Sequence, residues 1–343
     1  MKAIVKTGVG PGHVKYIQVP VPQPKAGEVL VKMRAAGLCG ADILLYDWTY
    51  RGKRPVVPPL ILGHEGVGEI VELGSDVDGF ARGDRVAMQS ILGCGKCPSC
   101  QRGHTHLCGA WAHLGMTFDG LFADYVVVPA EACHKLPDSV SDEEGAFLEF
   151  ISTVAHTDEK APFRLGETVV VVGPGPFGLL HLQGAKSAGA SRLIVTGLDS
   201  DAERLEIARR MGATDTVNAE REDPVQAVLD MTGGYGADMV IEAGGTPDSV
   251  SQALRMARPD GRVVLLGYAG LAEIVPISIV RSDLTIFGVV ASKRQHYQKA
   301  LKWMEAGLVR AEPLITHRMT LTEFDEAVDL FRGRRAIKVL FQM

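Results

Sequence analysis

The sequence lacks any long uninterrupted run of apolar residues. No stretch reaches the roughly 18 apolar residues that a membrane-spanning helix needs. The first residues, Met1 to Lys6, also lack the apolar core and small-residue cleavage site of a secretory signal peptide. Together these absences predict a cytoplasmic protein with no membrane partner.

An excess of positive charge is also missing. The 343 residues carry a formal net charge of -5, and the sequence pI is about 6.1. A general nucleic-acid binder would show a strongly basic face, so no nucleic-acid partner is expected. The hydrophobic content of 46% and charged content of 22% are ordinary for a globular enzyme, and the length predicts two domains.

Cysteine is scarce, but its six copies are unevenly placed. Four of them follow the pattern Cys94-x2-Cys97-x2-Cys100-x7-Cys108, while Cys39 and Cys133 stand apart. In a reducing compartment such clustering favours metal over disulfides, and four thiolates form a closed structural zinc site. An iron–sulfur cluster and reduced, unligated thiols are the alternatives, although the spacing is not that of common ferredoxins.

The first ~140 residues have the pattern of short strands separated by glycine, proline and aspartate. After them, Ser141-Asp142-Glu143-Glu144 forms a capping box that predicts a helix reaching Glu149 and His156. The strands expected in this region are 3–5, 14–19, 29–33, 67–73, 85–88 and 125–128.

From Glu167 onward, apolar strands alternate with helical patterns such as Ala202–Met211. Nearly all-apolar strands separated by helices indicate a parallel sheet covered on both faces, and six of them fit a doubly wound dinucleotide-binding (Rossmann) fold of the α/β class. The expected strands are 168–172, 192–196, 215–217, 238–242, 262–266 and 284–290.

The alternation of strands and helices does not continue in the last ~50 residues. Helices are expected near 296–306 and 323–331, followed by a final strand at 337–341, and we expect this segment to return to the first domain. The predicted boundaries are therefore 1–150 for a β-rich catalytic domain with a zinc lobe at about 90–110, 151–291 for the dinucleotide-binding domain, and 292–343 for the returning segment.

A glycine-rich turn, Gly173-Pro174-Gly175-Pro176-Phe177-Gly178, follows the apolar strand 169–172 and opens a helix. In that context GxGxxG predicts a pyrophosphate site. The first glycine makes the turn, the second admits the phosphate, and the third lets helix and strand pack closely. A glycine-rich turn in an unrelated α/β fold is the alternative.

The residues that choose between NAD and NADP give a mixed signal. The acidic residue expected at the end of the second strand is replaced by Gly197, while Asp199 lies two residues further on and could reach the ribose. Arg204 could instead bind a 2′-phosphate, but Asp199 and Asp201 would repel it. NAD is therefore favoured and NADP stays open.

A second metal site is suggested by Cys39, the pair His64-Glu65 between glycines, and Glu149. Sulfur, imidazole and carboxylate form a ligand set that zinc accepts. Each residue alone has an ordinary explanation as a buried or helix-terminal side chain. Their presence beside a nucleotide-binding turn predicts one zinc ion facing a nicotinamide.

The combination resembles the zinc-dependent medium-chain dehydrogenase/reductase family, which has a GroES-like catalytic domain and a Rossmann domain. The similarity covers essentially the whole chain, and within the family it points to the L-threonine 3-dehydrogenase and sorbitol (polyol) dehydrogenase branch. The motifs that carry this narrower likeness are 45–48, 105–108, 154–157 and 315–318, with Glu149 where alcohol dehydrogenases have cysteine.

The resemblance implies residue roles. The zinc ligands would be Cys39, His64 and Glu149, and Glu65 would exchange with water or substrate on the metal. Asp42 would orient His64, Thr153 would lie against the nicotinamide, and Lys338 would lie near the pyrophosphate. Two zinc ions per chain and NAD are the implied cofactors. The last strands of the nucleotide domain would form a homodimer or homotetramer.

The implied activity is oxidation of a secondary alcohol to a ketone, with hydride transfer to NAD(P)+. A polyol or sugar-derived alcohol is the favoured substrate, L-threonine is the enzymatic alternative, and an inactive nucleotide-binding homologue is the alternative of another class. The usual proton-relay positions hold Ala41 and Leu44, which weakens the case for threonine.

The surroundings of the site also depart from the family. Phe150 replaces the usual proline after the zinc carboxylate, and with Trp48, Trp111 and Leu114 it is expected to narrow the pocket. Arg51, Lys53 and Arg54 form a basic loop that could recognise an anionic or polyhydroxyl substrate, although a solvated loop is the simpler explanation.

Overall fold

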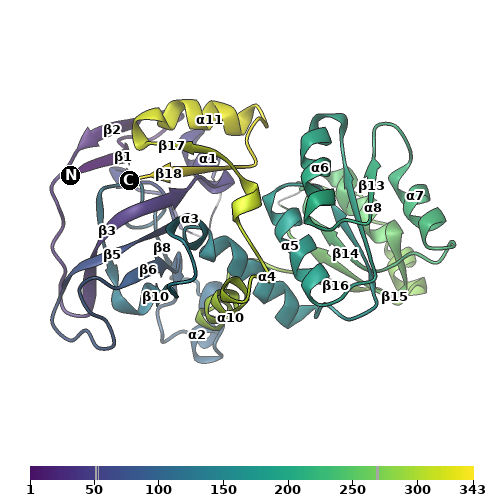
Figure 1. Cartoon of the computed structure of the whole chain (residues 1–343), viewed down its shortest axis with the longest axis horizontal. Coiled ribbons are helices and arrows are strands. Elements are labelled where there is room, and N and C mark those ends of the chain that lie inside the picture. Colours follow the sequence, from purple (N-terminus) through teal and green to yellow (C-terminus); the bar gives the residue numbers. More distant parts are fainter. Residues whose placement is uncertain (51, 53, 268–269) are drawn as a thin grey trace. The chain divides into compact units, whose positions relative to one another are not determined.

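A computed structural model describes residues 1–50, 52, 54–267 and 270–343. The chain forms two compact units, each with its own β-sheet (Figure 1). The first unit contains Met1–Ser152, Ala291–Glu305 and Leu314–Met343, and the second contains Thr153–Val290 and Ala306–Pro313. Within the described residues, no helix combines the length and apolar character needed to span a membrane.

The first unit is built on a seven-stranded, largely antiparallel sheet. Its order is β10-β6-β5-β3-β18-β17, with β9 also pairing with β3. These strands are β3 (Glu28–Gly37), β5 (Glu65–Leu73), β6 (Arg85–Met88), β9 (Tyr125–Pro129), β10 (Cys133–Lys135), β17 (Ile315–Met319) and β18 (Lys338–Gln342). Beside it lie the sheet β2-β1-β4 (Val14–Gln18, Lys2–Lys6, Leu60–Ile61) and the hairpin β7-β8 (Ile91–Leu92, Ala112–His113).

Strand register explains how residues far apart in sequence meet in this unit. Gly37 at the end of β3 pairs with Glu65 at the start of β5, and Leu340 of β18 pairs with Gly37 from the other side. The residues that follow β3 and the residues that begin β5 are thereby held together. The final strand pairs with β3 from the opposite end of the sequence, whereas Ala306–Pro313, within the predicted returning segment, belongs to the second unit.

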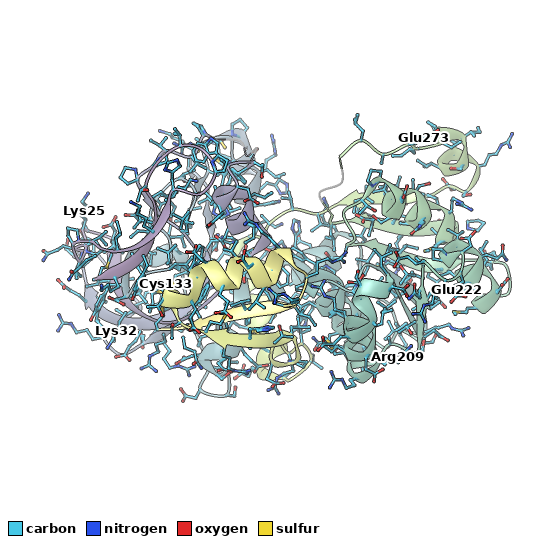
Figure 2. All side chains as sticks on the ribbon, turned by 90° about the horizontal axis from the view of Figure 1, so that it is seen from above. Lys25, Lys32, Cys133, Arg209, Glu222 and Glu273 are labelled. Atoms are coloured by element: carbon cyan, nitrogen blue, oxygen red, sulfur yellow. The ribbon has the colours of Figure 1, made fainter. Side chains whose placement is uncertain are left out.

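Short helices complete the first unit. They are α1 (Gly40–Tyr46), α2 (Pro98–Gln101), α3 (Asp142–Gly145), α10 (Arg294–Glu305) and α11 (Phe324–Arg332), with 3-10 turns η1 (Thr105–Leu107), η2 (Ala130–Ala132) and η5 (Leu321–Glu323). Its core includes Phe122, Phe324 and Phe341, whose ring centroids lie 5.2–5.9 Å apart. Side chains such as Lys25 and Lys32 point outward in Figure 2, whereas Cys133 is buried.

Ser141 is the N-cap of α3, which is one half of the predicted capping box, because its hydroxyl accepts a hydrogen bond from the Glu144 amide at 3.2 Å. The expected continuous helix is wrong in one respect. α3 ends at Gly145, and a separate helix, α4 (Leu148–Lys160), begins three residues later. Glu149 therefore lies in the first turn of a new helix.

The second unit confirms the predicted doubly wound sheet. All of its strand pairings are parallel, in the order β13-β12-β11-β14-β15-β16. The strands are β11 (Thr168–Val172), β12 (Arg192–Gly197), β13 (Asp215–Asn218), β14 (Ala237–Glu242), β15 (Ala257–Leu265) and β16 (Thr285–Gly288). The connecting helices are α5 (Pro176–Ser187), α6 (Ala202–Met211), α7 (Pro224–Met231), α8 (Pro247–Met256) and α9 (Pro276–Arg281), with the turns η3 (Asp199–Asp201) and η4 (Glu312–Leu314).

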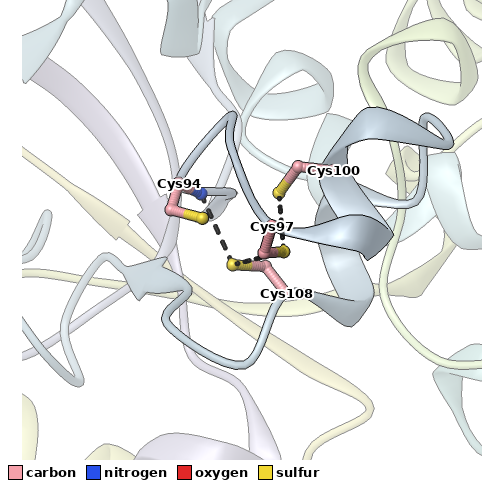
Figure 3. Close-up of side chains that lie close together, drawn as sticks. All are labelled: Cys94, Cys97, Cys100 and Cys108. Atoms are coloured by element: carbon pink, nitrogen blue, oxygen red, sulfur yellow. Dashed lines mark hydrogen bonds between the residues drawn. The ribbon is translucent and has the colours of Figure 1, made fainter.

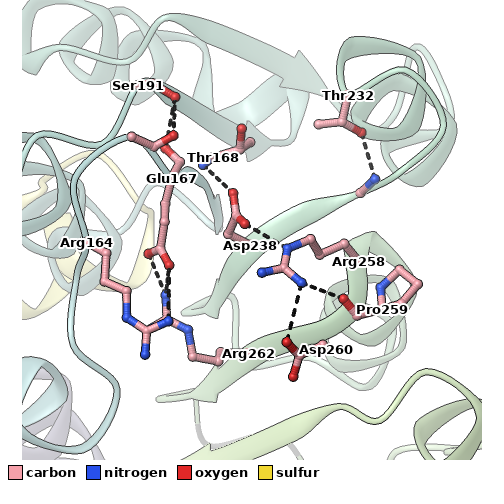
Figure 4. Close-up of polar contacts among 12 residues, drawn as sticks. Arg164, Glu167, Thr168, Ser191, Thr232, Asp238, Arg258, Pro259, Asp260 and Arg262 are labelled. Carbon is pink, nitrogen blue, oxygen red and sulfur yellow. Dashed lines mark hydrogen bonds and ion pairs between the residues drawn. The ribbon is translucent and has the colours of Figure 1, made fainter.

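Ion pairs fasten the edge of this sheet where the strands begin (Figure 4). The buried Arg262 guanidinium binds both carboxylate oxygens of Glu167, which precedes β11. Asp238 accepts from the Thr168 amide at 2.8 Å and from Arg258 Nε at 2.7 Å. Ion pairs therefore stabilise the end of the sheet where the strands begin. The glycine-rich turn lies at the opposite end, where the strands finish.

Candidate active site

Three predicted metal ligands lie together in the first unit. One ligand atom each of Cys39, His64 and Glu65 lies within 4.8 Å of the others. Cys39 caps α1, and His64 and Glu65 lie at the start of β5, so the β3–β5 register brings them into contact. His64 and Glu65 are buried. We refer to these three residues as the mixed metal group.

Asp42 lies beside two members of this group, and its role in orienting His64 stays a prediction. Its Oδ2 accepts a hydrogen bond from the Cys39 amide at 3.0 Å, and its Oδ1 lies 3.5 Å from His64 Nδ1. Burial opposes a charge on His64, but Asp42 and Cys39 outweigh it and raise the pKa of His64 well above its usual value. With Nδ1 facing a carboxylate, Nε2 is the nitrogen left for a metal.

Glu65 is paired with Lys338. The Lys338 ammonium donates to Glu65 Oε2 at 2.6 Å and to the Leu38 carbonyl at 3.1 Å, and it lies 4.5 Å from the Phe150 ring centroid. Burial alone would lower the pKa of Lys338, yet Glu65 and Cys39 raise it. The structure thus places Lys338 beside the mixed metal group, where its charge balances Glu65. Its predicted role near the pyrophosphate stays a prediction.

Glu149 lies outside the mixed metal group, although it is close enough for His64 and Glu65 to influence its charge. Its Oε1 accepts a hydrogen bond from the Ser90 hydroxyl at 2.8 Å. Burial raises the pKa of Glu149, and repulsion from Glu65 adds to that effect. The structure therefore gathers Glu65 with Cys39 and His64, whereas the sequence favoured Glu149 as third ligand. Direct ligation by Glu149 stays a prediction.

The mixed metal group fits a zinc ion. It offers sulfur, imidazole nitrogen and carboxylate oxygen, which zinc accepts in catalytic sites. Glu65 Oε1 is buried and has no hydrogen-bond partner among the described residues. A buried carboxylate oxygen without a partner is costly, and a bound cation would satisfy it.

The four-cysteine segment forms a second group. One ligand atom each of Cys94, Cys97, Cys100 and Cys108 lies within 4.8 Å of the others (Figure 3). The Cys97 sulfur lies 3.5 Å from that of Cys100 and 3.7 Å from that of Cys108. This arrangement fits a closed four-sulfur zinc site.

Backbone amides favour thiolates in this segment. Cys108 Sγ accepts from the amides of Cys94 at 3.4 Å and Ala110 at 3.3 Å. The Cys100 amide hydrogen bond lowers the pKa of Cys97 to about 6. Burial acts in the opposite direction on Cys100 and raises its pKa to about 12. A cation would stabilise all four as thiolates, because the ligand form of cysteine is the anion.

The glycine-rich turn of the second unit lies between β11 and α5, and its predicted role in pyrophosphate binding stays a prediction. Gly173 has φ 96°, and a Cβ there would lie 2.8 Å from Gly244. A Cβ on Gly178 would lie 2.2 Å from the Gly173 carbonyl, whereas a Cβ on Gly175 would meet nothing within 4 Å. The first and third glycines are thus required by packing. The open space at Gly175 lies at the N-terminus of α5, where Pro176 and Phe177 begin the helix and anions are favoured.

The two residues predicted to choose the cofactor lie after β12. Asp199 Oδ1 accepts from Asn218 Nδ2 and from Arg221 Nε, both at 2.7 Å. Arg204 Nη1 lies 3.8 Å from Asp201 Oδ1. Arg221, which the sequence did not single out and which follows β13, therefore forms an ion pair with Asp199.

The residues predicted to contact the nicotinamide or to line the pocket are partly described by the structure. Thr153 is buried on α4, at the start of the second unit. Phe150 packs against Lys338, and Trp48 lies under the Lys6 ammonium at 5.0 Å. Arg54 donates to the Trp111 carbonyl at 3.1 Å, whereas Arg51 and Lys53 lie outside the described residues.

Three buried neighbours of this site were not singled out from the sequence, namely His113, Ser90 and Tyr297. His113 lies edge-on to His64, with ring centroids 5.2 Å apart, and Trp111 lies edge-on to His113 at 4.9 Å. Ser90 bonds Glu149, and Tyr297 bonds Ser90. The polar pair Gln89-Ser90, flanked by the apolar residues Met88 and Ile91, is a weak signal that the sequence did contain.

Comparison with known proteins gives the same family along the chain. The family model "Alcohol dehydrogenase GroES-like domain" matches residues 25–138, and "Zinc-binding dehydrogenase" matches residues 176–306. A sorbitol dehydrogenase of Halalkalibacterium halodurans is 38% identical, with 99% of this chain and 98% of the relative covered. An L-threonine 3-dehydrogenase of Pyrococcus horikoshii is 37% identical, with 100% and 99% covered.

A solved structure from Sinorhizobium meliloti, bound to NADP, is similar over the whole chain. Its TM-score is 0.92 at 32% identity, and 100% of this chain and 99% of that chain are covered. The likeness therefore includes the GroES-like unit, the parallel sheet and the order in which they occur.

Proposed function

The chain belongs to the family of zinc-binding alcohol dehydrogenases with a GroES-like domain, and from this premise we propose that it oxidises a secondary alcohol with NAD(P)+. The observation that carries the proposal is the mixed metal group, in which sulfur, imidazole and carboxylate converge within 4.8 Å. A polyol or sugar-derived alcohol is the proposed substrate, and the product is the ketone.

The chain's own residues prepare this site. Asp42 accepts a hydrogen bond from the Cys39 amide and faces His64 Nδ1 at 3.5 Å, which leaves Cys39 Sγ and His64 Nε2 for a metal. Lys338 neutralises one oxygen of Glu65 and leaves the other without a partner. Zinc held there would act as a Lewis acid on the substrate oxygen, and a nicotinamide would accept the hydride.

Cofactor binding is proposed for the second unit. The open space at Gly175 and the N-terminus of α5 suit a pyrophosphate. Asp199 supports NAD, since its carboxylate can accept from ribose hydroxyls, while Arg221 beside it could accommodate a 2′-phosphate. We propose NAD as the principal cofactor, with NADP accepted less well.

L-Threonine is the second candidate substrate, because relatives named for it are 33–37% identical over the whole chain. Against it, Ala41 and Leu44 on α1 carry no group that can pass a proton. Polyols are therefore placed first.

We also propose that the protein is a homo-oligomer. β16 is the last strand of the parallel sheet, and α9 beside it has no buried residue. Val280 is 73% exposed and Ile277 is 52% exposed, and Ile286 of β16 is exposed as well. An apolar edge of this kind is typical of a surface that pairs with a second copy.

Metal analysis and a substrate panel test the proposed function. The wild-type protein should bind two zinc ions per chain and Cys39→Ala only one, with loss of turnover on every substrate. Rates on sorbitol, butanediol, inositol, sugar acids and threonine, with both cofactors, should be highest for a polyol with NAD. Highest turnover on threonine supports the second candidate. One zinc and no turnover in the wild type would instead identify an inactive nucleotide-binding homologue.

A further inference from the structure

Ser90 is a buried residue fixed by three hydrogen bonds. Its hydroxyl donates to Glu149 Oε1 at 2.8 Å, its amide donates to the Tyr297 hydroxyl at 3.3 Å, and its carbonyl accepts from the Leu114 amide at 2.9 Å. Only 1% of Ser90 is exposed. A hydroxyl held this firmly can impose a direction on the carboxylate that it binds.

Tyr297 is itself held from the opposite side. It lies on α10 and is fully buried, and its ring stacks on His134 with centroids 4.8 Å apart and planes 7° apart. His134 Nε2 lies 3.4 Å from Gln89 Oε1, and Gln89 Nε2 donates to the Ile91 carbonyl at 2.7 Å. The residues on both sides of Ser90 therefore belong to one buried polar network.

We propose that Ser90, held in place by Tyr297, is a positioning residue that orients the Glu149 carboxylate toward the metal of the mixed metal group. The hydrogen bond occupies Oε1 and leaves the second carboxylate oxygen to face the metal, either directly or through water. Oxygen ligands whose partner oxygen is hydrogen-bonded are held in a fixed orientation, and their metal affinity depends on that bond. The inference rests on the proposed zinc chemistry.

The geometry favours this role over simple satisfaction of a buried carboxylate. Glu149 lies in the first turn of α4, and its backbone carbonyl is separately held by the Ser152 hydroxyl. The backbone and the side chain of Glu149 therefore have different hydroxyl partners. Ser90 controls only the carboxylate, so its loss should change the metal environment while α4 stays in place.

Cobalt substitution and zinc competition test the proposal in the full-length protein. In Ser90→Ala we expect the affinity of the mixed metal group to fall about 10- to 100-fold, the range seen when a residue behind a metal ligand is removed. The visible absorption bands of cobalt at this group should also shift. The four-cysteine segment should keep its metal, because no Ser90 contact reaches it in the described structure. Tyr297→Phe should lower the metal affinity less than Ser90→Ala does. Ser90→Thr, which keeps a hydroxyl, should retain the wild-type affinity.

Ser292→Ala is the matched control, since Ser292 is 2% exposed and its hydroxyl has no partner among the described residues. Its metal affinity and cobalt spectrum should equal those of the wild type. Unchanged affinity and spectrum in Ser90→Ala overturn the proposal, and so does an equal loss in Ser292→Ala. A wild-type protein that binds a single metal would instead count against the proposed function, which keeps the two failures distinct.

Discussion

One buried imidazole makes the stability of the second unit depend on pH. His181 lies on α5, where its Nδ1 bonds the Phe177 carbonyl at 2.7 Å and its Nε2 bonds the Thr157 hydroxyl at 2.8 Å. With one nitrogen facing a carbonyl, the ring is neutral and accepts from Thr157. Burial lowers the pKa of His181 to about 4.

The sign of the effect follows from the lowered pKa. Above pH 6.5 the His181 imidazole is neutral in both the folded and the unfolded state. Below pH 6.5 it binds a proton in the unfolded chain, whereas in the folded protein it stays neutral down to about pH 4. We expect the unfolding free energy to fall by about 3 kcal/mol between these values. Denaturant unfolding measured from pH 7.5 to 4.5 should show that the unfolding free energy of His181→Asn depends less steeply on pH than that of the wild type. Parallel slopes in the two proteins would contradict the prediction.

At the residue scale, the sequence predicted some of the contacts in the candidate site and missed others. Cys39, His64 and Asp42 come together as expected, because they flank paired strands. The contact between Lys338 and Glu65 spans 273 residues, and no local pattern can reveal it. The same holds for Tyr297 and Ser90, which lie 207 residues apart.

At the element scale, the four-cysteine segment has little structure of its own. Between β7 and β8 it contains only α2 and η1, each a single turn. Segments of this kind depend on bound metal for their fold.

We therefore expect Cys97→Ser to lose one zinc ion and to become sensitive to protease between residues 93 and 110. Metal analysis and mass spectrometry of limited digests measure both effects. Cys133→Ala is the control, since Cys133 is buried and lies apart from the cluster, and it should retain two zinc ions. Equal protease resistance of Cys97→Ser and the wild type would contradict a metal-dependent fold.

Prediction of elements succeeded where burial is strongest. β11 and β12 are apolar on both faces, so their sequences leave little choice but a parallel sheet. β7, β8 and β10 have two or three residues each, which is too short for a periodic signal. The sequence also does not predict the break between α3 and α4, because neither Ala146 nor Phe147 is a residue type, such as glycine or proline, that typically ends a helix.

At the scale of the whole molecule, the apolar edge of the second unit predicts assembly. Val280→Glu places a charge on a side chain that is 73% exposed in the single chain. We expect this substitution to shift the protein toward a smaller species in analytical ultracentrifugation, because a buried interface would have to desolvate the carboxylate. Glu273→Gln on the outer surface of the same unit (Figure 2) is the control and should leave the sedimentation unchanged. Identical sedimentation of Val280→Glu and the wild type would exclude this edge as the interface.

The order in which the chain is synthesised adds a constraint on the first unit. Cys39, His64 and Glu65 leave the ribosome early, but β18, which pairs with β3, and Lys338, which balances Glu65, are among the last residues made. Until then the Ala35–Gly37 end of β3 lacks its β18 partner, and Glu65 lacks the Lys338 ammonium. The second unit, whose sheet is made from one continuous stretch of chain, can fold first. Completion of the first unit thus waits for the end of translation, because its last strand and the cation beside Glu65 come from the final residues of the chain.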